Sequence, residues 1–244
     1  MSSKKTDFQE RKERVLGIVV DEYIKSTTPV GSHFIVQQYS LDLSPATIRN
    51  ILAELEEEGY LSHPHTSAGR VPTQTGYRYY VDHLMHQIQL LEKEKVRLHQ
   101  EYAQDLNELE TALDHASQAI SEITHCTSII AVDGWGQKMI CKGTSFVVNY
   151  PEERDLESIR AILRTLEQKE QILKLINRDL EKKVSIYIGH EMALKEMDGC
   201  SLAVARFSNR GAEGRIAVLG PTRMDYERVV SALDYVCGLI NRGI

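Results

Sequence analysis

Three stretches near the amino end of the chain carry apolar residues at helical spacing. The first covers residues 7–25, and the proline of Thr28-Pro29 disfavours its continuation. The second opens at Gly31-Ser32 and stops in the polar residues 40–42. The third opens at Ser44-Pro45, because a serine oxygen can accept from an orphan backbone N–H and a proline at the first helical position has no N–H to lose. We therefore expect three short helices in succession.

After the third helix the pattern changes from helical spacing to alternation. Gly59 suits a left-handed cap that ends the helix. Residues 61–72 contain proline, glycine and serine between alternating apolar positions, which predicts a small hairpin with Ala68-Gly69-Arg70 at its tip. Three short helices followed by a hairpin form the outline of a winged helix-turn-helix. We therefore expect residues 1–81 to be a winged-helix DNA-binding domain.

Residues 77–124 carry a longer helical pattern, in which the steps between apolar positions alternate between four and three. One extra step of four, from Tyr102 to Leu106, is a stutter that would locally unwind a coiled coil. We expect a continuous helix with residues 82–125 as a connecting and dimerisation segment, packed on another subunit or on the following domain. The apolar positions of the pattern are Leu84, Ile88, Leu91, Leu98, Tyr102, Leu106, Leu109, Leu113, Ala116, Ile120 and Ile123.

The remaining residues, 126–244, mix strand-like and helical patterns. Short apolar or alternating runs predict strands at residues 128–132, 145–148, 184–188, 202–207 and 214–219. Helical spacing predicts one helix or a helical pair over residues 152–183 and a final helix over 222–240. We expect Thr222 and Asp225 to form a capping box at the start of that final helix. The combination predicts an α+β fold, a sheet with helices packed on it.

The net negative charge of the chain disfavours general binding to polyanions but allows a local binding site for them. The net charge of the 244-residue chain is -6, so a nucleic-acid site must be a local patch on an acidic body. Such a patch is visible in the sequence, because glutamates cluster at residues 54–58 and no carboxylate follows from Gly59 through Val81. The segment is polarised so that one surface can lie against a polyanion.

The third helix has a face suited to DNA. Its apolar positions, Ile48, Ile51, Leu52 and Leu55, form one inward stripe. At 100° per residue, the outward side then carries Ala46, Asn50 and Ala53, with Thr47 and Arg49 on the flanks. Small residues allow close approach to a major groove, and arginine and asparagine can make paired hydrogen bonds to guanine and adenine edges. The alternative is an ordinary packed helix with a solvated face.

The hairpin supplies a second set of possible DNA contacts. Its polar and basic side chains suit phosphates or the minor groove, and they are His63, His65, Thr66, Ser67, Arg70 and Arg78. His63 and His65 could instead be read as metal ligands, but neither a carboxylate nor a cysteine is nearby in the sequence. We expect no metal site.

Other classes of protein lack their usual signals. The four cysteines are widely spread without a C-x-x-C pair, which indicates reduced core thiols. The amino terminus has no apolar signal-like core, and no apolar run approaches the roughly 20 residues of a membrane span, so we expect a cytoplasmic protein without a membrane partner. A nucleophile with its base, a carboxylate pair at a defined site and a nucleotide-binding glycine loop are all missing, so we do not expect an enzyme.

Several blocks of the sequence carry a family resemblance. "DEYIKSTTPVGS", "SPATIRN", "LEEEGYLSHPHTSAGRVPT" and "GYRYYVD" stand in this order at the amino end, and "CSLAVARF" and "GRIAVLGPTRMDY" stand near the carboxyl end. In these blocks the chain resembles the heat-inducible transcription repressor HrcA family. The resemblance implies a homodimer that binds an inverted-repeat operator upstream of chaperone operons, represses them, is released on heat stress, and depends on the GroE chaperonin to stay active.

The resemblance also implies where DNA is bound. Thr47, Arg49 and Asn50 fall in its recognition-helix block, and Ser67, Gly69 and Arg70 in its wing block. The resemblance and the charge polarity of the segment together give the predicted DNA-binding residues. They are Ser44, Ala46, Thr47, Arg49, Asn50, His65, Thr66, Ser67, Gly69, Arg70 and Arg78.

The chain departs from the family pattern in two ways. Ile51-Leu52 stands where the family usually has an acidic residue and methionine. Members also have a GAF-like domain with an inserted dimerisation segment before the "GTSFVV" region, where this chain has only residues 127–142. We therefore expect a reduced GAF-like domain, nearly filled by its own side chains and without a cofactor.

Two readings from other classes stay open at this stage. One is a small-molecule-responsive winged-helix regulator, in which the carboxyl-terminal domain holds a metabolite. The other is an assembly protein that uses its coiled helix and never touches DNA.

Overall fold

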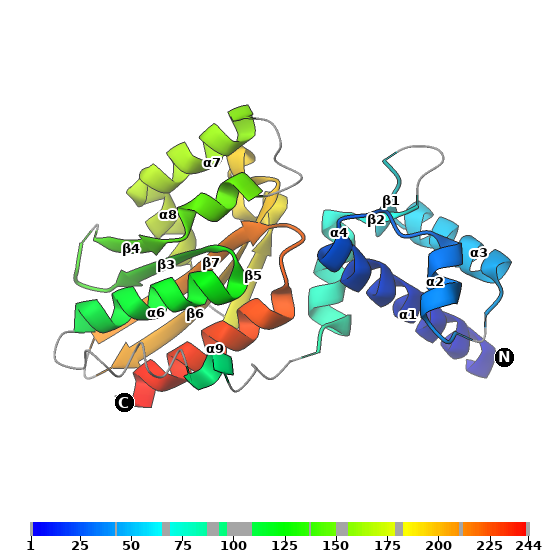
Figure 1. Cartoon of the computed structure of the whole chain (residues 1–244), viewed down its shortest axis with the longest axis horizontal. Helices are drawn as coiled ribbons and strands as arrows, with labels where there is room; N and C mark the ends of the chain where they lie inside the picture. The colour runs from blue at the N-terminus through cyan, green and yellow to red at the C-terminus, as the bar shows by residue number, and fades with distance from the viewer. Residues whose placement is uncertain are drawn as a thin grey trace. The chain divides into compact units, whose positions relative to one another are not determined.

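A computed structural model describes residues 2–41, 43–64, 69–86, 93–96, 109–136, 138–149, 156–178, 183–209 and 212–242 (Figure 1). The chain divides into two compact units, Met1–His86 and Gln87–Ile244. Each unit has its own core. In the described residues, helices and sheet are combined as the predicted α+β class requires.

The first unit contains the three predicted helices and the predicted hairpin. Its elements are α1 (Ser2–Ser26), α2 (Ser32–Gln38), α3 (Pro45–Glu57), β1 (Leu61–Ser62), β2 (Val71–Pro72), α4 (Gln74–Tyr79) and the π-helix η1 (Tyr80–Leu84). The two strands are antiparallel, with Leu61 opposite Pro72 and Ser62 opposite Val71. Helix periodicity and turn residues were therefore sufficient to identify the three helices and the hairpin.

Both ends of α3 follow the predicted local chemistry. Ser44 is the N-cap, and its side chain accepts a hydrogen bond from the backbone N–H of Thr47 at 3.1 Å. Gly59 has φ of 79°, the left-handed conformation that suits glycine at the end of a helix. Between these ends, the helix buries its predicted apolar stripe, Ile48, Ile51, Leu52 and Leu55. The opposite side of α3 is therefore left toward solvent.

The hairpin is fastened to the loop between α1 and α2. The backbones of Val30 and Arg70 exchange two hydrogen bonds, each 2.9 Å long. This bridge places Gly69 and Arg70 beside β2 rather than at the tip, which corrects the sequence expectation. Ala68, the third residue of the expected tip, lies outside the described residues, as do residues 65–67.

The second unit is built on a five-stranded antiparallel sheet with the strand order β4-β3-β7-β6-β5. The strands are β3 (Thr127–Val132), β4 (Met139–Lys142), β5 (Val184–Ile188), β6 (Cys200–Asn209) and β7 (Ala212–Pro221). Helices α6 (Leu109–Thr124) and α9 (Tyr226–Arg242) cover one face, and α7 (Leu156–Glu167) and α8 (Lys169–Ile176) cover the other (Figure 1). The described residues of this unit also form the 3-10 helices η2 (Thr144–Asn149), η4 (Gly189–Met192) and η5 (Lys195–Met197).

Two expectations about the second unit are wrong. Residues 145–148 lie in the 3-10 helix η2 and not in a strand, while β4, which the sequence reading missed, pairs with β3. A short apolar run does not distinguish a strand from a buried turn of helix. The final helix begins at Tyr226, because Asp225 is its cap and accepts from the backbone N–H of Arg228 at 3.0 Å. Thr222 is buried before the helix and forms no capping box with Asp225.

The long helix expected over residues 77–124 is not continuous. The chain leaves helical geometry at Met85, which has φ of -62° and ψ of 131°. Residues 93–96 are helical again, and residues 87–92 and 97–108 of the predicted pattern lie outside the described residues. In α6, the apolar positions Leu113, Ala116 and Ile120 are buried, and α6 packs on β3, β4 and α9 of its own unit. The periodicity of this part therefore reflects packing on a sheet.

Among the described residues, the structure contains no helix that is both long and apolar enough to cross a membrane. The four cysteines are free thiols. Burial raises the pKa of Cys126 to about 12 and that of Cys141 to about 11, which keeps both thiols protonated near neutral pH.

Candidate nucleic-acid interface

The outward side of α3 is accessible, as the charge pattern predicts. Ser44, Ala46, Arg49 and Asn50 are exposed. Thr47 is half-buried, and its hydroxyl lies 2.9 Å from the hydroxyl of Ser44. The hydroxyl of Ser44 therefore caps the start of α3, a role that the sequence also indicated.

Two side chains on this surface have hydrogen-bond donors without a partner among the described residues. Arg49 and Asn50 make no hydrogen bond or ion pair with any residue that the structure describes. The first turn of α3 carries no acidic residue. A guanidinium and an amide held on a rigid helix, away from carboxylates of the same turn, are suited to phosphate oxygens and base edges.

The glutamates at the other end of α3 are held by a lysine of α1. The Lys12 amine lies 3.4 Å from a carboxylate oxygen of Glu54 and also bonds to Glu58, while the lysine is only 6% exposed. Burial alone would lower the pKa of Lys12, but the hydrogen bonds and charges of Glu58 and Glu54 outweigh burial and leave this pKa above its ordinary value. These two acids therefore join α3 to α1.

Glu56 is turned toward the hairpin. Its carboxylate lies 2.7 Å from a guanidinium nitrogen of Arg70 and also bonds to the ring of His63. The segment from Gly59 to Val81 contains no carboxylate in sequence, but in the fold the carboxylate of Glu56 on α3 contacts its side chains. This contact was missed by sequence reasoning, since it joins residues of a helix and a hairpin that only the fold brings together.

The other predicted residues have different positions. Arg78 lies in α4 rather than in the hairpin, and its guanidinium is 3.1 Å from Asp82. Position 69 requires glycine for steric reasons, because a Cβ at this position would lie 2.5 Å from the carbonyl carbon of Val30. His65, Thr66 and Ser67 lie outside the described residues.

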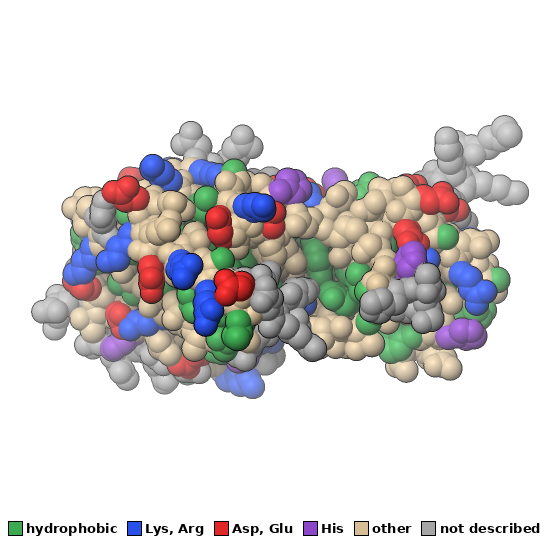
Figure 2. Space-filling view, turned by 90° about the horizontal axis from the view of Figure 1, so that it is seen from above, with side chains coloured by type: hydrophobic (Ala, Val, Ile, Leu, Met, Phe, Trp, Pro, Cys, Tyr) green, Lys and Arg blue, Asp and Glu red, His purple; other side chains and the backbone are tan. Residues whose placement is uncertain are grey.

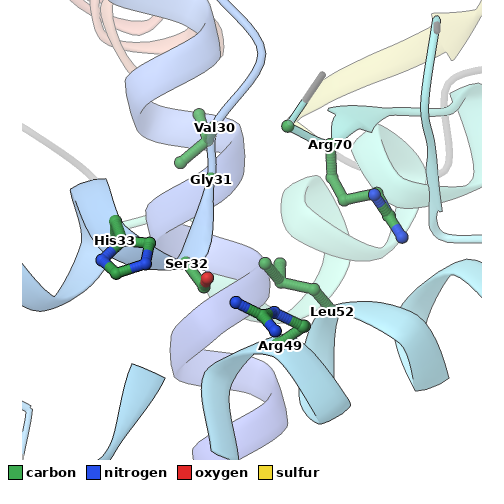
Figure 3. Close-up of a pocket in the computed structure, with 8 residues that line it drawn as sticks. Val30, Gly31, Ser32, His33, Arg49, Leu52 and Arg70 are labelled. Atoms are coloured by element: carbon green, nitrogen blue, oxygen red, sulfur yellow. The ribbon is translucent and has the colours of Figure 1, made fainter. Parts of the chain in front are cut away.

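An open depression lies beside Arg49 (Figure 3). It has a volume of about 320 Å³ and is bordered by the start of α2, by α3 and by the residues next to β2. Its lining residues include no aspartate or glutamate, and they are Val30, Gly31, Ser32, His33, Arg49, Leu52, Gly69 and Arg70. The sequence reading did not identify Ser32 and His33, whose relevance arises from the packing of α2 against α3.

The second unit has a different character. On the face drawn in Figure 2, its acidic and basic side chains are interspersed. The space between the sheet and α7 and α8 is occupied by a cluster of buried apolar side chains that includes Ile162, Ile172, Met192, Met197 and Leu202. Among the described residues, no group of three or more histidine, cysteine, aspartate or glutamate side chains is arranged to hold a metal.

Comparisons with known proteins connect the chain to one family. The model described as "HrcA protein C terminal domain" matches residues 84–230. A protein of Carboxydothermus hydrogenoformans named "Heat-inducible transcription repressor HrcA" is 28% identical over 328 positions, which cover 94% of this chain and 96% of the relative. A protein of the same name from Geobacter sulfurreducens is 26% identical over 336 positions, which cover 97% and 98%.

The alignment lengths also bear on the size of the chain. The alignment with the Carboxydothermus protein spans 328 positions, more than the 244 residues of the whole chain, so that relative carries residues without a counterpart in this chain. A solved structure described as "Crystal structure of a hypothetical protein at 2.2 A resolution" has a TM-score of 0.81 and 16% identity over 96% of this chain and 97% of its own. At that identity the likeness concerns the fold alone.

Proposed function

The chain belongs to the HrcA family, and from this premise we propose that it is a heat-inducible transcription repressor that binds operator DNA through its first unit. In this proposal α3 is the recognition helix of a winged helix-turn-helix, and the hairpin of β1 and β2 is its wing. The chemistry is binding, and no catalytic step is involved.

The observation that carries the proposal is the exposed, acid-free start of α3. Asn50 is exposed and has no partner among the described residues, so its amide is available to an adenine edge. Ala46 is exposed and small, which permits close approach to a groove. Glu54 and Glu58 both contact Lys12 on α1, so part of their negative charge is offset within the protein.

We further propose that repression uses a homodimer, in which two winged-helix heads occupy an inverted repeat upstream of chaperone operons. The second unit would then be a reduced GAF-like domain, in which α7 and α8 close the sheet over the apolar cluster. We also propose release on heat stress and dependence on the GroE chaperonin, as the resemblance to the HrcA family implies. Footprinting on the protein's own chaperone promoters at two temperatures, with and without chaperonin, tests these points.

The DNA-binding assignment is tested by measuring affinity for an inverted-repeat duplex and for a scrambled duplex at several salt concentrations. We expect affinity to fall steeply as salt rises, because phosphate contacts release counterions. Asn50→Ala should reduce the preference for the inverted repeat by about 1–3 kcal/mol. Its thermal stability should stay within about 0.5 kcal/mol of the original, because the side chain is exposed.

The matched control is Arg160→Ala, which removes an exposed arginine from α7 in the second unit. This variant should bind both duplexes like the unchanged protein. Salt-independent binding by the unchanged protein, or full sequence preference in Asn50→Ala, would contradict the assignment of α3 as the recognition helix.

A further inference from the structure

We propose that the depression beside Arg49 is a seat for one phosphate of the DNA backbone, and that Arg49 is the cation that holds it. The proposal rests on the proposed function and deepens it, because it separates the roles of two neighbouring residues of α3. Arg49 would fix the position of the protein on the duplex, and Asn50 would read a base.

The position of Arg49 favours a backbone contact. Its side chain lines the depression and extends from α3 toward Ser32 at the start of α2 (Figure 3). Asn50, the next residue, lies about 100° further around the helix and is not among the lining residues. Consecutive residues of one helix are thus aimed at two different features, a recess between two helices and the open outward face.

The chemistry of the lining suits an anion. Ser32 brings a hydroxyl and His33 brings an imidazole, and neither side chain is bonded to a residue that the structure describes. A planar guanidinium with several N–H groups can bind two phosphate oxygens at once. Arg49 has no carboxylate partner among the described residues, so its charge is available.

Arg70 has a secondary role in this site. Its guanidinium points away from Arg49 in Figure 3, in keeping with its 2.7 Å contact with Glu56. The positive charge of Arg70 is therefore balanced by the protein itself. This difference makes Arg49, and not Arg70, the main phosphate ligand of the depression.

Gly31 allows a test that separates binding from folding. It is the N-cap of α2, with φ of -102° and ψ of 159°, and a Cβ built on it meets no atom within 4 Å. Aspartate and asparagine both fit this conformation and are both favourable N-caps, so neither variant should be less stable than the unchanged protein. Only Gly31→Asp places a negative charge at the depression.

We expect Gly31→Asp to bind operator and scrambled duplexes about 10- to 100-fold more weakly than Gly31→Asn, the range of one hydrogen bond to a charged group. Gln37→Glu adds the same charge at an exposed position of the same helix, outside the lining, and should lose much less. Equal affinities of the Gly31 variants, or an equal loss in Gln37→Glu, would overturn the proposed seat.

Arg49→Ala provides the second readout. It should weaken binding to every duplex and reduce the slope of log affinity against log salt by about 0.9, the effect of one lost phosphate contact. The ratio of affinities for operator and scrambled DNA should not change. A loss of that ratio with an unchanged slope would show that Arg49 reads a base. These outcomes concern the seat only, because the proposed function is tested by the salt dependence of the unchanged protein.

Discussion

The substitution Gly69→Ala decides whether this glycine is needed for packing or for a DNA contact. A Cβ at residue 69 would lie 2.5 Å from the carbonyl carbon of Val30, 2.6 Å from its oxygen and 2.7 Å from the carbonyl carbon of Pro29. All three are backbone atoms, which cannot rotate out of the way as a side chain would. Gly69 and Arg70, which precede β2, must therefore move away from the loop between α1 and α2.

The cost follows from what that movement breaks. The two 2.9 Å backbone hydrogen bonds between Val30 and Arg70 contribute about 0.5–1.5 kcal/mol each. Crowding in a packed site adds about 1–3 kcal/mol. The total of about 2–6 kcal/mol is a large part of the roughly 5–15 kcal/mol that holds a domain folded. For a unit of this size, about 4–8 °C is lost per kcal/mol, so the midpoint should fall by about 10 °C or more.

Calorimetry of the whole chain measures this midpoint, and amide hydrogen exchange measures protection at Val30 and Arg70. Gly31→Asn is the matched control, because the added Cβ meets open space in the same unit and asparagine is a favourable N-cap. We expect Gly69→Ala to unfold earlier and to lose amide protection at both positions. An unchanged midpoint and unchanged protection, together with weaker DNA binding, would refute the packing argument and support a direct DNA contact.

Two further predictions concern polar contacts of the first unit. Glu56→Gln removes the carboxylate shared by Arg70 and His63. It should lower the free energy of unfolding by about 1–2 kcal/mol, which lies between the values for exposed and buried ion pairs. In urea titrations this loss of stability should be smaller at high salt than at low salt, because salt screens the pair. Burial and a 2.6 Å hydrogen bond to Glu22 raise the pKa of Tyr39 to about 12, against about 10 in an unfolded chain. The stability contributed by the protonated phenol of Tyr39 should therefore be present below pH 10 and lost as pH rises through 12. A Tyr39→Phe variant that loses as much stability over this pH range would show that Tyr39 is not the group responsible.

Local signals in the sequence were sufficient where local chemistry decides the structure. The cap at Ser44, the left-handed Gly59 and the apolar stripe of α3 depend on residues close together in the chain, and all were predicted correctly. The stripe of α6 was also recognised, but not what it packs against. A helix that buries one face looks the same in sequence whether a second helix or a sheet covers that face.

In the candidate site too, the features that depend on local sequence were predictable and those that depend on packing were not. Exposure of Arg49 and Asn50 follows from helix geometry once the apolar stripe of α3 is known. The contact between Arg70 and Glu56, and the depression that Arg49 lines, depend on how the hairpin and α2 pack against α3. Such contacts leave no periodic signal, because their residues are separated by turns whose geometry the sequence does not specify.

The placement of charge on α3 connects stability with binding. Its acids would repel a phosphate backbone if their charge were unbalanced, yet Glu54 and Glu58 contact Lys12, and Glu56 contacts Arg70. Lys12 is nearly buried, so its ion pairs are screened less by salt than pairs in open water. The same pairs that hold α3 against α1 and the hairpin therefore also offset part of the negative charge at this end of the helix. Arg49 has no carboxylate partner among the described residues, and for this reason we propose that its charge holds a phosphate.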